Sequence, residues 1–416
     1  MSARQLQTQC CIAGGGPAGM MLGLLLARAG VRTIVLEKHA DFLRDFRGDT
    51  IHPSTLEVMH ELGLAERLLS LPHQKVAGLT AQFGDTPLQL ADFSRLPVRC
   101  PFIAMMPQWD FLNFLAEAGK RYPGFSLIMQ AEATKLIESD GRISGVRATV
   151  EENPAEILAD LVVGADGRGS TLRAEAGLGI EDIGAPMDAL WFRLPRDASD
   201  TDQTQARFDA GRIFVMLNRG DYWQCAFVIA KGSYDRLVAA GLEAFRGSVG
   251  ALVPFDAGRA NAIASWDDVK LLNVKVDRLK EWARPGLLFI GDAAHAMSPV
   301  GGVGINLAIQ DAVAAANILA RPLLEGRCNF EDLKGVQRRR TFPTRMTQAL
   351  QVAVQNNVIS RALEERGNLR PPLLLRLMSR YAFLRRIPAR LVGMGVRPEH
   401  VAEFIRMANG PVAQQA

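Results

Sequence analysis

The sequence predicts an α/β fold in which a Rossmann-like domain carries an inserted antiparallel β-sheet domain and is followed by a helical C-terminal region. Three observations support this prediction. Apolar strands run into glycine-containing loops at three places, residues 181–275 hold short strands rich in aromatic and branched side chains, and residues after 320 have helical periodicity. At 416 residues the chain exceeds a single ordinary core, so we expect two domains.

The first glycine-containing loop follows a strand predicted for Thr8 to Ala13. It reads Gly14-Gly15-Gly16-Pro17-Ala18-Gly19, which satisfies G-x-G-x-x-G between a strand and an apolar helix. In this pattern the glycines make the turn, admit a pyrophosphate close to the backbone and let the helix pack on the strand. A second strand, Val31 to Leu36, ends in Glu37, which is placed to accept hydrogen bonds from ribose hydroxyls. These features predict a dinucleotide site, with a turn that serves packing alone as the alternative.

The second loop, Gly164-Ala165-Asp166-Gly167, ends an apolar strand predicted for Leu161 to Val163. The loop presents a carboxylate at a strand edge. Because Asp-Gly is also a common turn dipeptide, a simple turn residue is the alternative for Asp166.

The third loop lies between a buried strand, Leu287 to Ile290, and an apolar helix predicted from about Val303 to Leu319. The strand stops at Gly291-Asp292. A carboxylate at this edge is able to accept hydrogen bonds from sugar-like hydroxyls, while the free N–H groups and the dipole of the helix favour negative charge. Taken alone, the stretch is equally compatible with a packing turn.

A further helix is predicted from Ser54 to Leu62, with Ser54 as its N-cap and Glu57 three residues later, the pattern of a capping box. Arg47, before this helix, is able to reach a phosphate or a carboxylate, or is an ordinary surface arginine. His52 and His60 have no third ligand nearby in the sequence, and the five cysteines show no Cys-x-x-Cys spacing. We therefore expect no metal site.

The inserted region of residues 181–275 is predicted to form an antiparallel sheet, and the segment 76–100 is also strand-like. Side chains that face inward from such a sheet, over a ligand held by the first domain, are able to line a substrate pocket. The candidates are Trp191, Arg193, Tyr222 and Trp223, each with ordinary sheet packing as its alternative.

The composition is that of a soluble globular protein, with 48% hydrophobic and 22% charged residues. No apolar run reaches the roughly 18 residues of a membrane span, and the polar start Met1 to Gln9 lacks signal-peptide architecture, so we expect a cytoplasmic protein. A net charge of +4, without a basic stripe and a readable motif, does not indicate a nucleic-acid partner.

The C-terminal tail, residues 361–416, is predicted to be helical and is rich in arginine. One helix face carries Leu374, Leu377, Met378, Tyr381 and Leu384, and another carries Arg376 and Arg380. Helices of this kind are able to lie on anionic membranes. More often they pack on their own protein and solvate their arginines, and we expect this packing for the tail.

With the three loops in this order, the sequence resembles the FAD-dependent monooxygenases of the para-hydroxybenzoate hydroxylase type, the single-component aromatic hydroxylases. Gly14 to Gly19 with Glu37 is similar to their first fingerprint, Gly164 to Arg173 to their Asp-Gly motif, and Gly291 to Asn306 to their Gly-Asp motif. The resemblance spans about residues 8–320 and is weakest in 181–275. It implies an FAD-binding domain of residues 1–75, 101–180 and 276–360, a substrate-binding sheet domain of 76–100 and 181–275, and a helical tail of 361–416.

The resemblance also implies roles for individual residues. The implied FAD contacts are the pyrophosphate loop Gly14, Gly15, Gly16, Pro17, Ala18 and Gly19, the ribose acid Glu37 with Lys38, then Arg47, Gln108, Ala133, Asp166 and Gly167, the ribityl acid Asp292, and Pro299, Gly302, Val303, Gly304, Ile305 and Asn306 near the flavin ring. Asp166 would also link FAD and nicotinamide binding. The candidates for the catalytic and substrate side are Arg47, Asp49, His52 and Pro299. Ser54 departs from the family, in which many members have Arg after Pro.

The resemblance implies that NADPH or NADH reduces FAD and that reduced FAD reacts with O2 to give a C4a-hydroperoxide, which hydroxylates a small aromatic or polyketide-like substrate. Only one G-x-G-x-x-G occurs, because Gly393-Met394-Gly395 lacks the third glycine, and this fits a family that binds NAD(P)H transiently. Three alternatives stay open: a reductase, dehydrogenase or halogenase on the same scaffold, a flavin-binding protein without turnover, and a hydroxylase of a lipophilic quinone precursor at a membrane surface. The Trp-x-Trp-x-Ile-Pro motif usual in halogenases is absent.

Overall fold

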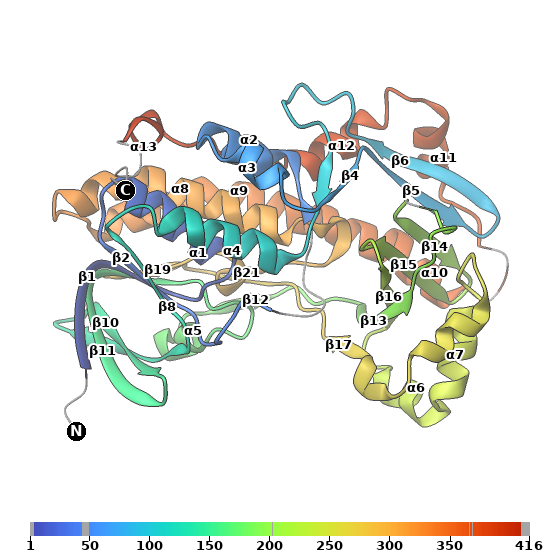
Figure 1. The fold of residues 1–416 in the computed structure, drawn as a ribbon, viewed down its shortest axis with the longest axis horizontal. Coiled ribbons are helices and arrows are strands. Elements are labelled where there is room, and N and C mark those ends of the chain that lie inside the picture. The colour runs from blue at the N-terminus through green and yellow to red at the C-terminus, as the bar shows by residue number, and fades with distance from the viewer. Residues whose placement is uncertain (1–3, 44–49, 202, 366, 368, 409–416) are drawn as a thin grey trace.

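Two β-sheets, joined by a pair of long helices, organise the chain (Figure 1). The computed structural model describes residues 4–43, 50–201, 203–365, 367 and 369–408. An eight-stranded sheet lies at one end of the elongated molecule and a seven-stranded sheet lies at the other. The predicted fold class, α/β with a second antiparallel sheet and C-terminal helices, is confirmed.

The eight-stranded sheet is built around β1, whose last residues, Cys10 to Ala13, are buried. The strand order is β19-β20-β11-β1-β2-β8, with β10 paired to β11 and β9 paired to β10. The bounds are β1 (Arg4–Ala13), β2 (Thr33–Leu36), β8 (Phe125–Ile128), β9 (Ala131–Ser139), β10 (Arg142–Val150), β11 (Asn153–Gly164), β19 (Ala283–Arg284) and β20 (Leu287–Phe289). β1 pairs in parallel with β2 and β11, and β11 pairs in parallel with β20, so their carboxyl ends share one edge.

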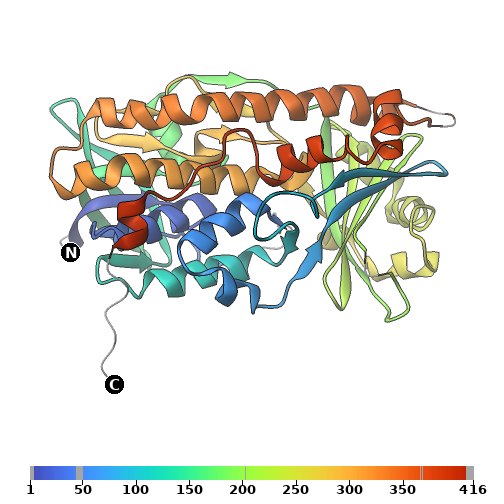
Figure 2. The same ribbon diagram turned by 90° about the horizontal axis from the view of Figure 1, so that it is seen from above.

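Apolar helices cover this sheet. α1 (Pro17–Arg28) is buried from Ala18 to Ala27 and packs against α4 (Gln108–Gly119) and α8 (Gly304–Leu324). α8 and α9 (Phe330–Val354) run side by side along the molecule (Figure 2). By length and composition the helix Val300–Leu324 is able to cross a membrane, but 78% of its apolar window is buried inside the protein, as in a core helix.

The seven-stranded sheet has the order β17-β13-β16-β15-β14-β5-β6. Its bounds are β5 (Gly78–Phe83), β6 (Thr86–Asp92), β13 (Met187–Pro195), β14 (Gln205–Asp209), β15 (Arg212–Asn218), β16 (Tyr222–Ala230) and β17 (Lys270–Leu272). All neighbours pair antiparallel except β14 and β5, which pair in parallel. One face packs on α6 (Tyr234–Ala240), α7 (Leu242–Gly250) and a 3-10 helix, Ala257–Ala262, none of which the sequence analysis predicts.

Shorter elements complete the fold. Two small sheets are formed by β12 (Ile180–Asp182), β18 (Asp277–Leu279) and β21 (His295–Ala296), and by β3 (Thr50–Ile51), β7 (Ile103–Met105) and β4 (Gln74–Val76). The remaining helical elements are α2 (Pro53–Glu61), α3 (Ala65–Leu69), α5 (Thr171–Ala176), the 3-10 turns Trp266–Asp268, Gly291–Ala293 and Val300–Gly302, the π segment Gln355–Ile359, α10 (Ser360–Glu364), α11 (Leu373–Arg380), α12 (Arg386–Gly393) and α13 (Glu403–Met407).

The predicted capping box at Ser54 is wrong. α2 begins at Pro53, with His52 in extended backbone as its N-cap. Proline has a fixed φ and no N–H, which suits the first helical position, so the helix starts one residue earlier. Ser54 is then buried inside the helix, and Glu57 accepts a hydrogen bond from the Arg99 N–H (2.8 Å) instead.

The predicted packing of the C-terminal apolar face is also wrong for most of its residues. The segment forms two separate helices, α11 and α12, because the chain leaves helical geometry at Tyr381. Leu374, Leu377 and Tyr381 are exposed, and α11 has no buried residue.

Candidate functional site

The three predicted loops meet at the carboxyl edge of the eight-stranded sheet. In the strand registers, Ala13 lies beside both Gly164 and Leu36, and Gly164 lies beside Phe289. Because these strands are parallel, the residues that follow them leave the sheet at one edge: Gly14 to Gly16, Ala165-Asp166, Glu37 and Gly291-Asp292. Ligands of open α/β sheets bind at this edge.

Gly14 and Gly19 occupy places that no larger residue fits. Gly14 has φ +111°, and a Cβ there would lie 2.3 Å from the carbonyl oxygen of Ala165. A Cβ at Gly19 would lie 1.9 Å from the carbonyl oxygen of Gly14. The glycine loop is therefore packed against the Asp166 loop on one side and against its own helix on the other.

Gly16, by contrast, borders open space, since a Cβ there would meet no atom within 4 Å. It is the N-cap of α1, with Pro17 as the first helical residue, and no side chain in the described part of the chain caps this N-terminus. Free backbone N–H groups at a helix N-terminus attract phosphate. The loop therefore fits a pyrophosphate.

The Glu37 carboxylate is fixed beside the glycine loop. One oxygen accepts a hydrogen bond from the Gly15 N–H (3.1 Å), and the other accepts one from the N–H of His39 (3.0 Å). The carbonyl oxygen of Glu37 accepts a hydrogen bond from the Ala131 N–H (2.8 Å), so the start of β9, which includes Ala133, lies next to this loop. An acid held in this place fits a ribose.

Asp292 pairs with an arginine of the Asp-Gly loop. The Nη2 atom of Arg168 lies 3.1 Å from Oδ2 of Asp292, and their side chains are 36% and 29% exposed. The pair is therefore reachable by a ligand at the sheet edge. Sequence reasoning assigns no role to Arg168, because its partner is 124 positions away and only the fold brings the two together.

Asp166 has one satisfied and one unsatisfied oxygen. Its Oδ2 accepts a hydrogen bond from the Leu172 N–H (3.2 Å), whereas Oδ1 is buried with no partner among the residues that the structure describes. Burial raises the pKa of Asp166 above its ordinary value, against the lowering effect of hydrogen bonds from Ser170 and Leu172. A ligand hydroxyl or amide would supply the donor that Oδ1 lacks. Gly167 follows with φ +84°.

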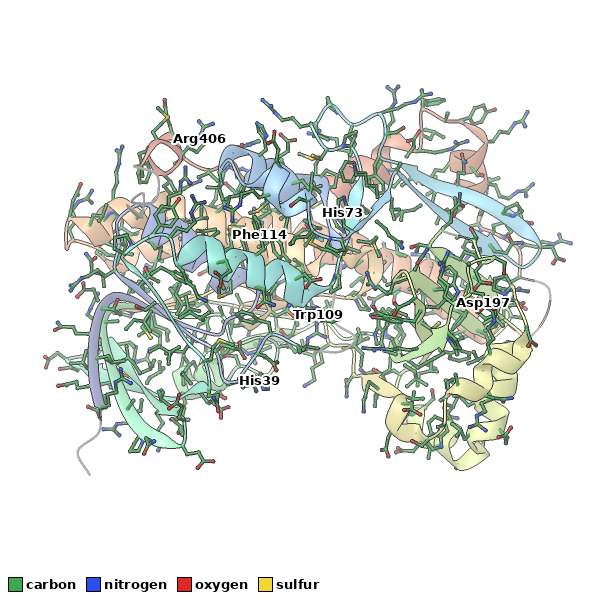
Figure 3. The ribbon with its side chains drawn as sticks, in the orientation of Figure 1. His39, His73, Trp109, Phe114, Asp197 and Arg406 are labelled. Atoms are coloured by element: carbon green, nitrogen blue, oxygen red, sulfur yellow. The ribbon has the colours of Figure 1, made fainter. Side chains whose placement is uncertain are left out.

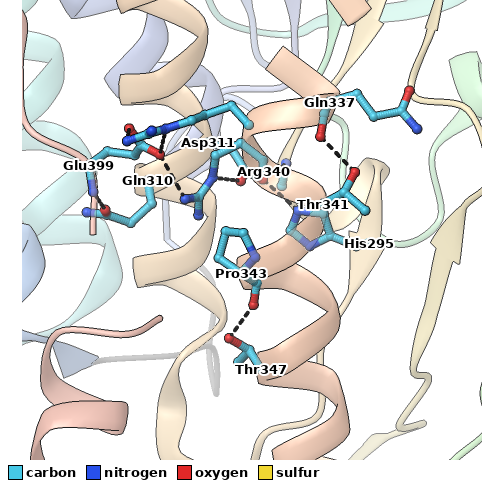
Figure 4. A network of polar contacts seen from close by, with 11 residues as sticks. His295, Gln310, Asp311, Gln337, Arg340, Thr341, Pro343, Thr347 and Glu399 are labelled. Atoms are coloured by element: carbon cyan, nitrogen blue, oxygen red, sulfur yellow. Dashed lines mark hydrogen bonds and ion pairs between the residues drawn. The ribbon is translucent and has the colours of Figure 1, made fainter. Parts of the chain in front are cut away.

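The buried carboxylate of Asp311 contacts the Gly291-Asp292 turn from the protein interior, and Figure 4 shows it beside His295 and Arg340. Oδ2 of Asp311, on α8, accepts a hydrogen bond from the Gly291 N–H (3.0 Å) and lies 2.6 Å from Nε2 of His295. Its Oδ1 accepts a hydrogen bond from Nε of Arg340, on α9 (2.8 Å). Burial on its own raises the pKa of Asp311, but His295 and Arg340 together hold it below the ordinary value.

The network continues into the C-terminal segment. Arg340 also donates to Glu399 (3.2 Å), and Arg339 donates two hydrogen bonds to the same carboxylate (2.7 and 3.0 Å; Figure 4). The loop at Gly291, both long helices and the chain near Glu399 are therefore tied to each other through ionised side chains. Two buried atoms of the network, Nη2 of Arg340 and Nδ1 of His295, have no hydrogen-bond partner among the described residues.

Three glutamines, Gln348 and Gln351 of α9 and Gln355 at the start of the π segment, hold the segment that leads to Pro299. Gln348 donates from Nε2 to the carbonyl oxygens of Asp277 (2.9 Å) and Ala296 (3.2 Å). Nε2 of Gln351 donates to the carbonyl oxygens of Ser298 and Val300 (both 2.8 Å), and Nε2 of Gln355 donates to Oγ of Ser298 (2.9 Å). Their spacing of three and four residues puts them on one helix face. This spacing is the signal by which the sequence would have revealed them.

The N-terminus of α8 is left open to a ligand. Val303 is its N-cap, Gly301 and Gly302 before it have positive φ, and no side chain of the described ranges caps it. Gly304 and Ile305, in its first turn, are half-buried.

The side chain of Asn306, in the same turn, is committed to the protein. Its Oδ1 accepts from the His52 N–H (2.9 Å) and from Oγ1 of Thr55 (2.7 Å), and its Nδ2 donates to the carbonyl oxygen of Thr50 (3.1 Å). The polar groups of this turn that are left to meet a ligand are therefore those of the backbone, and the helix dipole favours negative charge there.

His52 is fully buried, and burial lowers its pKa to about 4, so its ring is neutral near pH 7. Its Nδ1–H donates to the carbonyl oxygen of Val392 (2.7 Å), and Nε2 has no partner within the described residues. A neutral, buried imidazole is a poor proton acceptor near pH 7.

The other predicted residues near the site are placed as follows. Arg47 and Asp49 lie outside the described residues. Lys38 is exposed. Gln108 is the half-buried first residue of α4, and its neighbour Trp109 lies near the middle of the molecule (Figure 3).

The four predicted pocket residues do not lie together. Trp223 is fully buried in the core between the seven-stranded sheet and α7, and its Nε1 donates to Asp200 (3.0 Å). Since side chains alternate along a strand, Trp191 and Arg193 lie on the opposite face. The pocket role predicted for Trp223 is therefore wrong. The guanidinium of Arg193 lies over the ring of Tyr222 (4.7 Å).

The Trp191 face of this sheet turns toward the first domain. One end of the face packs against Val300 and Ile359, and the other end, through Leu217, packs against β7. Trp191 and its register neighbour Ala226 lie in the row between these ends. The indole N–H of Trp191 is buried and has no hydrogen-bond partner in the described part of the chain.

Comparisons with known proteins found the following similarities. Residues 7–349 match the model of a family described as "FAD binding domain". The chain is 32% identical over 355 residues to the 6-methylpretetramide 4-monooxygenase of Streptomyces rimosus, and the match covers 85% of each chain. It is 29% identical to the 12-dehydrotetracycline 5-monooxygenase/anhydrotetracycline 6-monooxygenase of the same species, of whose length it spans 60%. The p-nitrophenol 4-monooxygenase of Pseudomonas putida has a similar fold, with a TM-score of 0.75 at 18% identity over 95% of this chain and 100% of that one.

Proposed function

Because the chain belongs to the FAD-dependent aromatic monooxygenases, we propose that it hydroxylates a small aromatic or polyketide-like compound, with FAD as cofactor and NADPH or NADH as electron donor. Two relatives named above act on 6-methylpretetramide and on anhydrotetracycline, which supports a substrate of the polyketide-like class. The observation that carries the proposal is the row of loops at one sheet edge, Gly14 to Glu37, Asp166 and Asp292. We also propose a cytoplasmic site of action, where NAD(P)H is available.

In this proposal the sheet edge holds FAD along its length. The open N-terminus of α1 receives the pyrophosphate, Glu37 the adenosine ribose, and Asp292 the ribityl hydroxyls. Bound FAD would supply the electron transfer and the activation of O2. The N-terminus of α8 would favour negative charge on a ligand by roughly 0.3–2 kcal/mol.

The residues behind the site would keep these groups in place. The Gly291 N–H is held by Asp311, and the carbonyl oxygens on both sides of Pro299 are held by Gln351. Catalysis by orientation requires the reacting atoms to stay within a narrow range of positions, so a fixed loop supports a faster reaction than a mobile one. These residues act by positioning, and none of them exchanges a proton in the proposal.

The proposed substrate pocket lies between the Trp191 face of the second sheet and the loop around Pro299. Support comes from Val300, which packs against the same sheet face, and from the buried indole N–H of Trp191, which lacks a partner in the residues described. A carbonyl or phenol oxygen of the substrate would accept this hydrogen bond. The apolar side chains of this face, among them Met187, Val228 and Leu217, suit an aromatic ring.

The test is NAD(P)H oxidation by the purified, FAD-loaded protein in the presence of phenols, quinolones and polycyclic aromatic compounds. A monooxygenase is expected to be yellow and to consume NAD(P)H and O2 together, faster when its substrate is added. A protein without flavin affinity would contradict the proposal. Oxidation of NAD(P)H at the same rate without O2 would indicate a reductase instead.

A further inference from the structure

α11 and α12 carry an exposed surface that is both apolar and basic, which we call the basic apolar patch. The helices lie along one side of the molecule, beside the β5–β6 hairpin (Figures 1 and 2). The patch consists of the exposed side chains Leu373, Leu374, Leu377, Tyr381, Phe383 and Ile387 together with Arg370, Arg376, Arg380, Arg386 and Arg390. Leu373 is 68% exposed, Phe383 66% and Ile387 59%.

The helices are anchored, so this exposure belongs to the folded protein. Leu375 packs into a core with Phe83 and Leu88 of the hairpin. The Gln89 N–H donates to Oγ of Ser379 (3.2 Å). With about 3.6 residues per turn, the anchored side of α11 at Leu375 leaves residues 373 and 377 on the opposite side and residue 374 on the flank.

A second set of contacts fixes the junction between the two helices. Arg385 donates to the carbonyl oxygen of Met378 (3.2 Å) and also contacts the side chain of Gln89. Ala389 and Met394 pack with Phe93 in a separate small core. The patch is thus presented on a fixed platform.

The charges in the segment that carries the patch are all positive. Residues 366–398 contain eight arginines and no Asp, Glu or Lys. The whole chain has a net charge of +4, so the remainder carries −4 (+4 minus +8). A large apolar surface on a soluble protein usually marks an interaction site, and the arginines select an anionic partner.

We propose that the basic apolar patch docks reversibly on an anionic phospholipid bilayer. Leucine and aromatic side chains next to arginines are the composition of helices that lie in a membrane interface, where the apolar groups enter the acyl boundary and the guanidinium groups meet lipid phosphates. A second copy of the chain is a poorer occupant. A two-fold dimer through this patch would set the arginines of one copy against those of the other.

The proposal is tested by co-sedimentation of the 416-residue, FAD-loaded chain with phosphatidylcholine vesicles, with and without phosphatidylglycerol. The protein is expected to bind only the vesicles that contain phosphatidylglycerol and to be released by high salt, because salt screens the attraction. The readout is lipid binding and needs no turnover, so it is independent of the proposed function.

Variants separate the two parts of the patch. Each arginine near an anionic surface contributes about fivefold to binding, so Arg376→Gln with Arg380→Gln and Arg386→Gln should weaken it on the order of a hundredfold. Leu374→Ser with Leu377→Ser and Phe383→Ser should also weaken it strongly. All six side chains are half-buried or exposed, so FAD content and thermal unfolding should stay unchanged.

Matched controls lie elsewhere on the surface. Phe342→Ser with Met346→Ser removes exposed apolar groups of α9, and Arg338→Gln with Arg345→Gln and Arg361→Gln removes exposed charge. These controls should bind vesicles like the unaltered protein. Binding that does not depend on phosphatidylglycerol would overturn the proposal, and so would equal losses of binding in the control variants. It would also be overturned if the unaltered chain binds no vesicles and a patch variant dissociates a dimer.

Discussion

The ion pair between Asp292 and Arg168 is the contact that we expect bound FAD to meet, because both side chains are partly exposed at the sheet edge. If Asp292 holds hydroxyls of the ribityl chain, the variant Asp292→Ala loses hydrogen bonds worth about 1.5–3 kcal/mol each. We therefore expect the dissociation constant for FAD to rise about ten- to a hundredfold per lost bond. Titration of the apoprotein with FAD, followed by flavin fluorescence, measures this. An unchanged constant would show that the ribityl assignment is wrong.

The Trp191 indole gives a second prediction at the scale of a residue. Trp191→Phe keeps an aromatic ring and removes the N–H that lacks a partner in the described residues. One neutral hydrogen bond contributes about 0.5–1.5 kcal/mol, so KM for the hydroxylated substrate should rise by roughly two- to tenfold while FAD affinity stays the same.

Trp223→Phe is the matched control for this experiment. It removes a hydrogen bond to Asp200 in the core on the other face of the same sheet. This variant should lower the thermal unfolding temperature and leave KM unchanged. If the two tryptophan variants behave alike, the proposed pocket is on the wrong face.

At the scale of elements, the buried network around Asp311 connects the Gly291 loop with α8, α9 and the chain near Glu399. Asp311→Asn leaves Arg340 without its closest carboxylate in the interior. Breaking a buried ion pair on one side costs about 3–5 kcal/mol, so the free energy of unfolding should fall by about that amount in a urea titration.

The double variant Asp311→Leu with Arg340→Met distinguishes the effect of an unpaired buried charge from a simple loss of packing. Removal of both charges avoids an unpaired buried charge, so the double variant should be less destabilised than Asp311→Asn. A double variant that is clearly less stable than the single one would show that the charges themselves contribute stability.

The same network gives a pH dependence with a definite sign. The pKa of Asp311 is raised by burial but is held below its ordinary value by His295 and Arg340 together. A carboxyl with a lowered folded-state pKa contributes stability that is fully present above its unfolded pKa, near 4, and is lost as the pH falls through the folded pKa. The stability difference between the unaltered protein and Asp311→Asn should therefore be constant from about pH 5 to 7 and shrink below about pH 4. A difference that grows in acid would contradict this.

In the whole molecule, the eight-stranded sheet carries the proposed FAD site, the seven-stranded sheet carries the proposed substrate face, and α9 connects the two. Gln351 of α9 and Gln355 of the π segment that follows α9 hold the segment before Pro299, and the π segment also packs, through Ile359, on the second sheet. The loop near the proposed flavin ring and the proposed substrate face are thus held by one continuous helical element. A change at this junction should affect cofactor and substrate together.

The features of this molecule that the sequence predicts are those formed by residues that follow each other in the chain. Strand, glycines and carboxylate follow each other at Gly14, Asp166 and Asp292, so the sheet edge and its ligand class were predictable. Contacts between distant segments were not. The pairs of Arg168 with Asp292 and of Arg340 with Asp311 depend on register and packing, which no local pattern encodes.

In the second sheet and the tail, too, the sequence predicts the elements but not the contacts that they make. Short strands around Trp191 and Trp223 were predictable from composition, but which face each side chain takes depends on strand pairing. In the tail, the apolar face at Leu374 and Leu377 was recognised, and its exposure follows only from the way Leu375 anchors α11. Helical periodicity identifies a face without saying what covers it.

The proposed function requires that this sheet edge bind FAD for oxygen transfer to an aromatic ring. Its most direct test is turnover under isotopically heavy O2, with mass spectrometry of the product formed from the compound that most stimulates NAD(P)H oxidation. We expect a product that gains one heavy oxygen atom per NAD(P)H consumed in coupled turnover. With Asp292→Ala, the reaction should be much slower when FAD is limiting. Oxygen that comes from water, or a product formed equally well without O2, would contradict it.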